Sequence, residues 1–195
     1  MNDRDANTFE DLSQIYQAFD VDIAAYRGEA ACSKGCAYCC TDAGRIDITT
    51  MEGLIIRDAT GRMPRPQQNQ VKKALTRDMK KRETGQPSAC AFLQKNSACM
   101  IYLVRPFACR RVYSLHVCTR DKPPQLHRQV MERAQETVTA LQRLDHNGYS
   151  GHLSYIQHML DATRFRRTYL AGESKPEEIM AFGKSHGIVI NKMMV

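Results

Sequence analysis

The crowding of cysteines near residue 36 constrains this chain more than any other feature of its sequence. Four of its eight cysteines fall in one short run, Cys32-Ser-Lys-Gly-Cys36-Ala-Tyr-Cys39-Cys40. The other four lie farther along the chain, at Cys90, Cys99, Cys109 and Cys118. Thiolates this close together repel one another and oxidise unless a cation holds them, and zinc or an iron–sulfur core is their usual partner. The pattern therefore predicts a metal centre.

Length and composition indicate where such a centre would form. With 195 residues, 43% of them hydrophobic and 25% charged, the chain is expected to be a single soluble domain over residues 1–195. No apolar run is long enough to span a bilayer, and the polar start Met1-Asn-Asp-Arg-Asp does not resemble a secretory signal. We therefore expect a cytoplasmic protein. In a reducing compartment clustered cysteines favour metal binding over disulfides, with uncoordinated buried thiols as the remaining alternative.

The formal charge of +7 is weaker evidence for a nucleic-acid partner than its size suggests, because that count treats cysteines as neutral. Two sites of four thiolates around a divalent zinc would each carry about −2 and would lower the net charge to about +3. The most basic segment, over residues 67–82, is rich in Lys, Arg and Gln. It reads as a surface helix with a solvated face, and a contact with nucleic acid or an acidic protein is the alternative.

Apolar residues at helical spacing predict a mainly α fold. Helices are expected over residues 8–27, 67–82, 126–144, 152–170 and 174–187, with a capping box Thr49-Thr-Met-Glu52 opening a short one. Arg45 to Ile48 alternates like a short strand. Few long periodic segments lie between residues 29 and 120. We therefore predict an irregular cysteine-rich metal core there, packed between the N-terminal helix and the C-terminal helical part at 123–187.

The cysteine spacing predicts the ligand type but leaves the pairing open. Cys39 and Cys40 are neighbours, and neighbours on a helix diverge by about 100°, so they serve two centres or one of them is not a ligand. His116, two residues before Cys118, is an alternative ligand. Arg105 and Arg110 are expected to bind the cofactor by lowering thiol pKa and donating hydrogen bonds to sulfur. The predicted metal ligands are Cys32, Cys36, Cys39, Cys40, Cys90, Cys99, Cys109 and Cys118.

Several of these elements together resemble a known family. The run from Cys32 to Cys40, followed by Ile46, Ile48, Thr49 and Glu52, is similar to the signature of the CxxCxxCC family of zinc- or iron-chelating cysteine-cluster proteins. The later elements Cys90-Ala-Phe-Leu, Cys99-Met-Ile-Tyr, Arg105-Pro106 and Cys109-Arg110 also resemble it. Members are often labelled iron–sulfur oxidoreductases. The resemblance implies zinc or an iron–sulfur cluster and covers roughly residues 30–112.

Two other resemblances suggest enzymes. Flagellin lysine-N-methylases look like relatives that share the cluster, yet no glycine-rich turn after a strand indicates a site for S-adenosylmethionine. The run Cys32 to Cys39 also resembles the radical S-adenosylmethionine signature, but the repeated βα units of that fold are missing. We therefore expect a metal-binding protein with a redox or metal-handling role and a protein redox partner. A methylase-like enzyme and a zinc-stapled interaction module are the alternatives.

Overall fold

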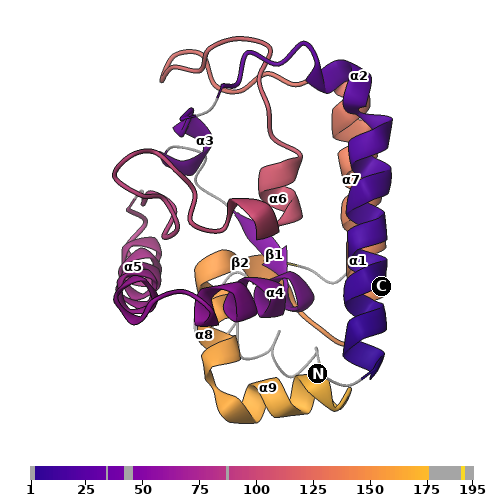
Figure 1. The fold of residues 1–195 in the computed structure, drawn as a ribbon, viewed down its shortest axis with the longest axis vertical. Helices are drawn as coiled ribbons and strands as arrows, with labels where there is room; N and C mark the ends of the chain where they lie inside the picture. The colour runs from indigo at the N-terminus through magenta and orange to yellow at the C-terminus, as the bar shows by residue number, and fades with distance from the viewer. Residues whose placement is uncertain (1–2, 34, 42–45, 87, 176–189, 192–195) are drawn as a thin grey trace.

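Helices make up most of the molecule. The computed structural model describes residues 3–33, 35–41, 46–86, 88–175 and 190–191 (Figure 1). In chain order the helices are α1 (Asp3–Asp22), α2 (Ala24–Arg27), α3 (Tyr38–Thr41), α4 (Thr50–Gly61), α5 (Arg65–Glu83), the 3-10 turn η1 (Tyr102–Val104), α6 (Phe107–Arg110), α7 (Arg128–Leu144), α8 (Leu153–Asp161) and α9 (Thr163–Leu170). The predicted mainly α fold is confirmed. Within the described residues, no helix combines the length and the apolar character needed to cross a membrane.

A small antiparallel sheet joins distant parts of the chain. Its strands β1 (Asp47–Thr49), β2 (Ser150–His152) and β3 (Ile190–Asn191) pair in that order, with Ile48 opposite Gly151. The strand predicted over 45–48 corresponds to β1, which ends at Thr49, one residue later than predicted. The second strand was not predicted, because three residues are too few to show an alternating pattern. Pairing of β1 with β2 places α4 and α8, which follow these strands, beside each other (Figure 1).

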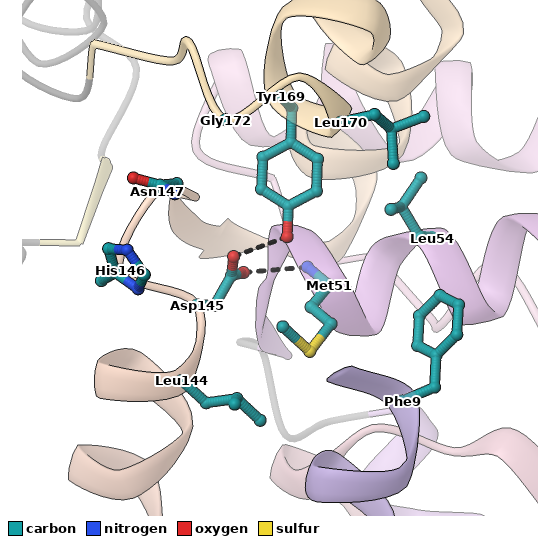
Figure 2. A pocket seen from close by; sticks show the side chains of 10 residues that line it. All are labelled: Phe9, Met51, Leu54, Leu144, Asp145, His146, Asn147, Tyr169, Leu170 and Gly172. Carbon is teal, nitrogen blue, oxygen red and sulfur yellow. Dashed lines mark hydrogen bonds between the residues drawn. The ribbon is translucent and has the colours of Figure 1, made fainter. Parts of the chain in front are cut away.

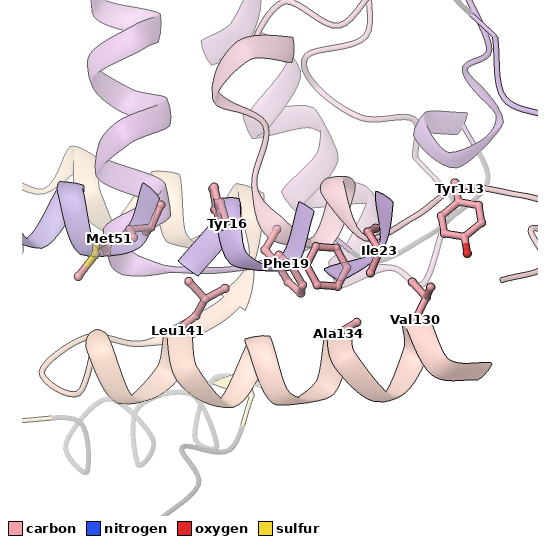
Figure 3. Packing of buried hydrophobic residues seen from close by; sticks show 10 residues of the cluster. Tyr16, Phe19, Ile23, Met51, Tyr113, Val130, Ala134 and Leu141 are labelled. Carbon is pink, nitrogen blue, oxygen red and sulfur yellow. The ribbon is translucent and has the colours of Figure 1, made fainter. Parts of the chain in front are cut away.

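One hydrophobic core lies between α1 and α7. Tyr16 and Phe19 of α1, with Ile23 just after it, face Val130 and other apolar residues of α7, and these four side chains are buried (Figure 3). The apolar positions predicted for the 8–27 helix therefore form this core face. Phe107 of α6 packs with its ring edge toward Phe19, 4.7 Å between ring centres. Because Cys109 also lies on α6, this core anchors part of the cysteine region.

A second core lies between α4, α5 and α8. Ile56, Val71 and Leu160 are fully buried there. Gly53 permits the close approach of α4 and α8, since a Cβ atom on it would lie 2.7 Å from Ile156 Cγ2. Cys90 and Cys99 pack against the edge of the same core. The two cores thus hold the later cysteines from opposite sides.

Three predicted helices differ from the structure or lie beyond it. The single helix expected over 8–27 is two helices, α1 and α2, which are separated at Ile23. The single helix expected over 152–170 is two helices, α8 and α9, because the chain is extended at Ala162 with ψ of 113°. The helix expected over 174–187 falls almost wholly outside the described residues. The capping box at Thr49 and Glu52 is present as predicted. Pro64 precedes α5, which begins at Arg65, close to the predicted start.

Candidate metal centre

The fold brings the two cysteine regions together. Only Tyr38–Thr41 of the first region is helical, and Gly35 before it adopts a φ of 92°, which excludes a regular helix from Cys32 onward. The N–H of Cys90 donates to the carbonyl of Cys40 at 2.7 Å. Beyond Cys90 the chain folds back through a turn at residues 94–98, and Leu93 bridges to Cys99. These turns bring the later cysteines back toward the first cysteine run.

Five thiols lie within electrostatic reach of one another. A negative charge on Cys39 raises the pKa of each of the other four, and Cys90 acts in the same way on Cys40 and Cys109. All five are partly buried. Burial, the larger cause, raises the pKa of Cys90 to about 11 and raises that of Cys109 further. We name this set the inner cysteine group; its members are Cys39, Cys40, Cys90, Cys99 and Cys109.

Three further thiols are linked through their effects on Cys32. Partial burial raises the pKa of Cys32, and so do the charges of Cys36, Cys118 and Cys39. Cys32 and Cys36 are exposed, whereas Cys118 is partly buried. The N–H of Ala31 donates to the carbonyl of Ser114 at 2.8 Å, which holds the start of the first cluster beside the segment that leads to Cys118. Cys32, Cys36 and Cys118 form the outer cysteine group, and Cys39 is within reach of both groups.

The adjacent pair Cys39 and Cys40 is electrostatically asymmetric. A hydrogen bond from the Cys40 thiol and the charge of Arg105 lower the pKa of Cys39 to about 6, although burial opposes this. The same hydrogen bond strongly raises the pKa of Cys40, and burial adds to the effect. The hydrogen bond between the two thiols thus favours ionisation of one member of the pair, and the thiolate is the form that binds soft cations.

The surroundings of the sulfurs fit a bound metal. Backbone N–H groups of Phe92, Ile101 and Ser114 donate to Cys90, Cys99 and Cys32 respectively, and each of these hydrogen bonds lowers the pKa of the thiol it reaches. Such N–H donors around thiolates support and orient metal ligands. In the described part of the chain, no three Cys, His, Asp or Glu side chains lie close enough together to hold an ion. Binding therefore requires the thiol side chains to turn toward a common point.

The two arginines predicted to bind the cofactor lie in different places. The Arg105 guanidinium stacks 4.4 Å from the Tyr102 ring centre and its charge favours the thiolates of Cys39 and Cys99. The Arg110 guanidinium packs 4.5 Å from the Tyr16 ring centre and pairs with Asp20 at 3.5 Å. The charge of Arg105 thus acts on the inner cysteine group, whereas Arg110 ties α6 to α1 and also donates to the carbonyl of Arg105 at 3.2 Å. Its cofactor role stays a prediction.

The alternative ligand His116 has a backbone contact. Its Nε2 lies 3.1 Å from the Pro123 carbonyl, and its N–H donates to the Ser114 hydroxyl at 3.3 Å. The Cys118 thiol donates to the His116 carbonyl at 3.8 Å. These contacts shape the loop that carries Cys118. None of these described contacts supports the predicted role of His116 as a metal ligand.

A buried polar network beside the inner cysteine group was not predicted. Asp78 of α5 accepts hydrogen bonds from the Ser154 hydroxyl and, at 3.0 Å, from Arg82 Nε, and lies 3.5 Å from His152 Nδ1. These residues line a small cavity together with Cys39, Cys40 and Cys90. Burial opposes ionisation of Asp78, but the hydrogen bonds from Ser154 and Arg82 lower its pKa overall. The only sequence signal was that Asp78 lies seven residues after Val71 and so shares the docked face of its helix.

A second carboxylate is buried on the far side of β1. Asp145 accepts hydrogen bonds from the N–H of Met51 at 2.9 Å and from the Tyr169 hydroxyl at 2.6 Å, at the wall of a cavity of about 260 Å³ (Figure 2). Burial raises the pKa of Asp145 to about 7, and the charge of Glu52 adds to this, while the two hydrogen bonds oppose it. None of the cysteines lines this cavity within the described residues. It is therefore separate from the candidate metal centre.

The raised pKa of Asp145 predicts a pH dependence of stability. The folded protein holds this proton more tightly than the unfolded chain, so the stabilisation is complete below about pH 4 and is lost as the pH rises through 7. Between pH 5 and pH 8 the free energy of unfolding should fall by about 2–3 kcal/mol from this group. Asp145→Asn should flatten that part of the profile. Urea unfolding of both proteins at four pH values tests this, and parallel profiles would contradict it.

Comparison with known proteins agrees with the prediction that the cysteine thiols bind a metal. The CxxCxxCC family model, described as a putative zinc- or iron-chelating domain, matches residues 31–142. Comparison with curated proteins found no significant match, and comparison with solved structures found none either. The matched segment contains all eight cysteines and covers more than half of the 195 residues. The chain therefore belongs to the CxxCxxCC family of metal-chelating proteins, with zinc or iron as the metal.

Proposed function

We propose that the protein uses its eight cysteines to hold zinc or an iron–sulfur cluster in a redox or metal-handling role. The observation that carries the proposal is the hydrogen bond from the N–H of Cys90 to the carbonyl of Cys40 at 2.7 Å, which brings the first cysteine run and the later cysteine region side by side. In this proposal the inner cysteine group forms the principal centre. Cys40 or another member then remains outside the set of four that zinc or a cluster requires.

The difference in exposure between the groups suggests different tasks. The inner cysteine group is partly buried and lies beside Arg105, whose charge offsets that of a thiolate centre. Cys32 and Cys36 of the outer cysteine group are exposed. Exposed thiols next to a buried centre could pass metal to it or from it, and an exposed cluster could exchange electrons with a partner protein. The choice between these roles depends on which metal is bound.

Purification without oxygen followed by elemental analysis tests the proposal directly. Iron with sulfide and absorbance near about 400 nm would identify a cluster and favour the redox role, whereas colourless protein with zinc would favour metal handling. Folded protein with neither metal would contradict the proposal.

Two matched variants test the division into groups. Cys90→Ser removes one thiol from the inner cysteine group, and Cys36→Ser removes one from the outer cysteine group. We expect Cys90→Ser to lose the principal metal, because a hydroxyl is a poor ligand for soft cations. Cys36→Ser should keep that metal. Equal loss of metal from the two variants, measured by elemental analysis, would show that the eight thiols do not divide in this way.

A further inference from the structure

A basic groove runs directly beside the inner cysteine group. Lys73, Arg77 and Lys81 of α5 line one side of a cavity of about 510 Å³, and the segment from Ser88 to Leu93, which contains Cys90, lines the other. The three cations follow one another at four-residue steps, so they share one face of the helix. In Figure 1, α5 stands at one side of the molecule, next to the chain that continues from it into the second cysteine region.

These three cations have no acidic partner among the described residues. The ion pairs of the neighbouring part of the molecule use Arg57, Arg62 and Arg82 instead. Lys73 and Arg77 are exposed and Lys81 is partly buried. Three like charges on one wall of a concave surface attract anions more strongly than isolated surface charges do. The groove therefore favours a ligand that carries several negative charges.

The spacing of the cations indicates the form of that ligand. Four residues of α-helix rise by about 6 Å, so the charges recur at about 6 Å along the groove. Alternate residues of an extended peptide are about 6.8 Å apart on one side of the chain. An extended segment with a carboxylate at every second residue therefore matches the row. The small side chains of Ala74, Ala89 and Ala91 in the same groove leave room for its backbone.

A single nucleic-acid strand has similarly spaced phosphates but fits this groove less well. Proteins that bind single strands stack the bases on aromatic side chains, at about 1–3 kcal/mol per base. The described residues that line the groove include no Phe, Tyr, Trp or His. We propose that the groove binds an extended acidic segment of a partner protein, next to Cys90. This inference rests on the proposed function, because it names the partner that would exchange electrons or metal with the centre.

A titration with a short synthetic peptide tests the inference. The probe is a fluorescein-labelled octapeptide of alternating Glu and Ala, added to the metal-loaded protein at low salt and followed by fluorescence anisotropy. The test variant is Lys73→Gln/Lys81→Gln. Its control, Lys72→Gln/Lys80→Gln, removes the same charge at the same spacing from the same helix, but these two lysines do not line the groove.

We expect the test variant to bind the peptide at least tenfold more weakly and the control less than threefold more weakly. Equal weakening of peptide binding in the two variants would mean that only the net charge of the protein attracts the peptide, and would overturn the inference. Tighter binding of an eight-nucleotide oligothymidine than of the peptide would also overturn it, in favour of nucleic acid. The metal content of every variant is measured separately. Absence of metal contradicts the proposed function, whereas normal metal with no difference between the variants contradicts the groove.

Discussion

Replacing Cys39 with serine is expected to remove the bound metal from both cysteine groups and to unfold the segment between α2 and α7. The charge of Cys39 raises the pKa of thiols in both groups, including Cys32 and Cys109. A structural zinc in a small peptide contributes an apparent free energy of about 10–16 kcal/mol. The net stability of a domain is about 5–15 kcal/mol, so loss of the metal is enough to unfold this region.

Elemental analysis and far-ultraviolet circular dichroism measure the two expected losses. Ala37→Ser is the matched control, because it adds a hydroxyl to the same short segment and keeps every thiol. Metal content and circular dichroism of the control should equal those of the unmodified protein. If Cys39→Ser also keeps both, the predicted role of this residue is wrong. A smaller loss in Cys36→Ser or Cys90→Ser than in Cys39→Ser would support the position of Cys39 between the groups.

Replacing Glu52 with alanine is expected to cost about 3–5 kcal/mol of stability, because three buried donors lose their acceptor and each such loss costs about 1–3 kcal/mol. Glu52 is buried, and its carboxylate accepts hydrogen bonds from the Tyr16 hydroxyl at 2.5 Å and from the N–H groups of Phe107 and Thr49, each at 2.7 Å. It therefore links α1, α4 and α6. Without it, two backbone donors and one hydroxyl lose their partner inside the protein.

The Glu52 variant should also weaken the metal centre. Phe107 begins α6, which carries Cys109, so release of its N–H allows this cysteine to move. Glu52→Gln should lose less stability, because its amide oxygen can still accept hydrogen bonds in place of one carboxylate oxygen. Some loss should remain, because its NH₂ group would face a donor. Glu10→Ala, at an exposed glutamate of α1, is the control and should change stability by less than about 0.5 kcal/mol. Urea unfolding and metal affinity are measured on all three, and equal unfolding midpoints for Glu52→Ala and Glu10→Ala would contradict the prediction.

Local sequence signals predicted much of the fold because they depend on neighbours along the chain. The stripe Tyr16, Phe19 and Ile23 follows helical spacing, and all three residues are buried in the core that α1 forms with α7. The capping box at Thr49 and Glu52 requires only residues three apart. The same local reasoning was wrong about residues 152–170, where the extended Ala162 divides one periodic pattern into two helices. A bend in the chain can leave the spacing of apolar side chains unchanged. Periodicity alone therefore does not reveal such a bend.

Interactions between distant residues could not be predicted in this way. The pairing of Ile48 with Gly151 and the network of Asp78, His152 and Ser154 join positions far apart in the chain. Neither leaves a repeating pattern in the sequence, because each depends on how whole elements pack. The groove beside Cys90 has the same origin: the basic face of α5 was visible in the sequence, but the wall opposite it was not.

The sequence by itself determined the mainly α fold and the chemistry of the centre, because thiols crowded at these spacings require a soft or borderline cation. Only the tertiary structure decided that the charge of Cys39 acts on Cys90, Cys99 and Cys109 from the later part of the chain, and that Cys32 and Cys36 are exposed. The physical reason is that residue type and spacing along the chain set the preference for soft or borderline cations, whereas contacts between distant residues, such as those of Glu52 with α1 and α6, fix where each element that carries a cysteine lies.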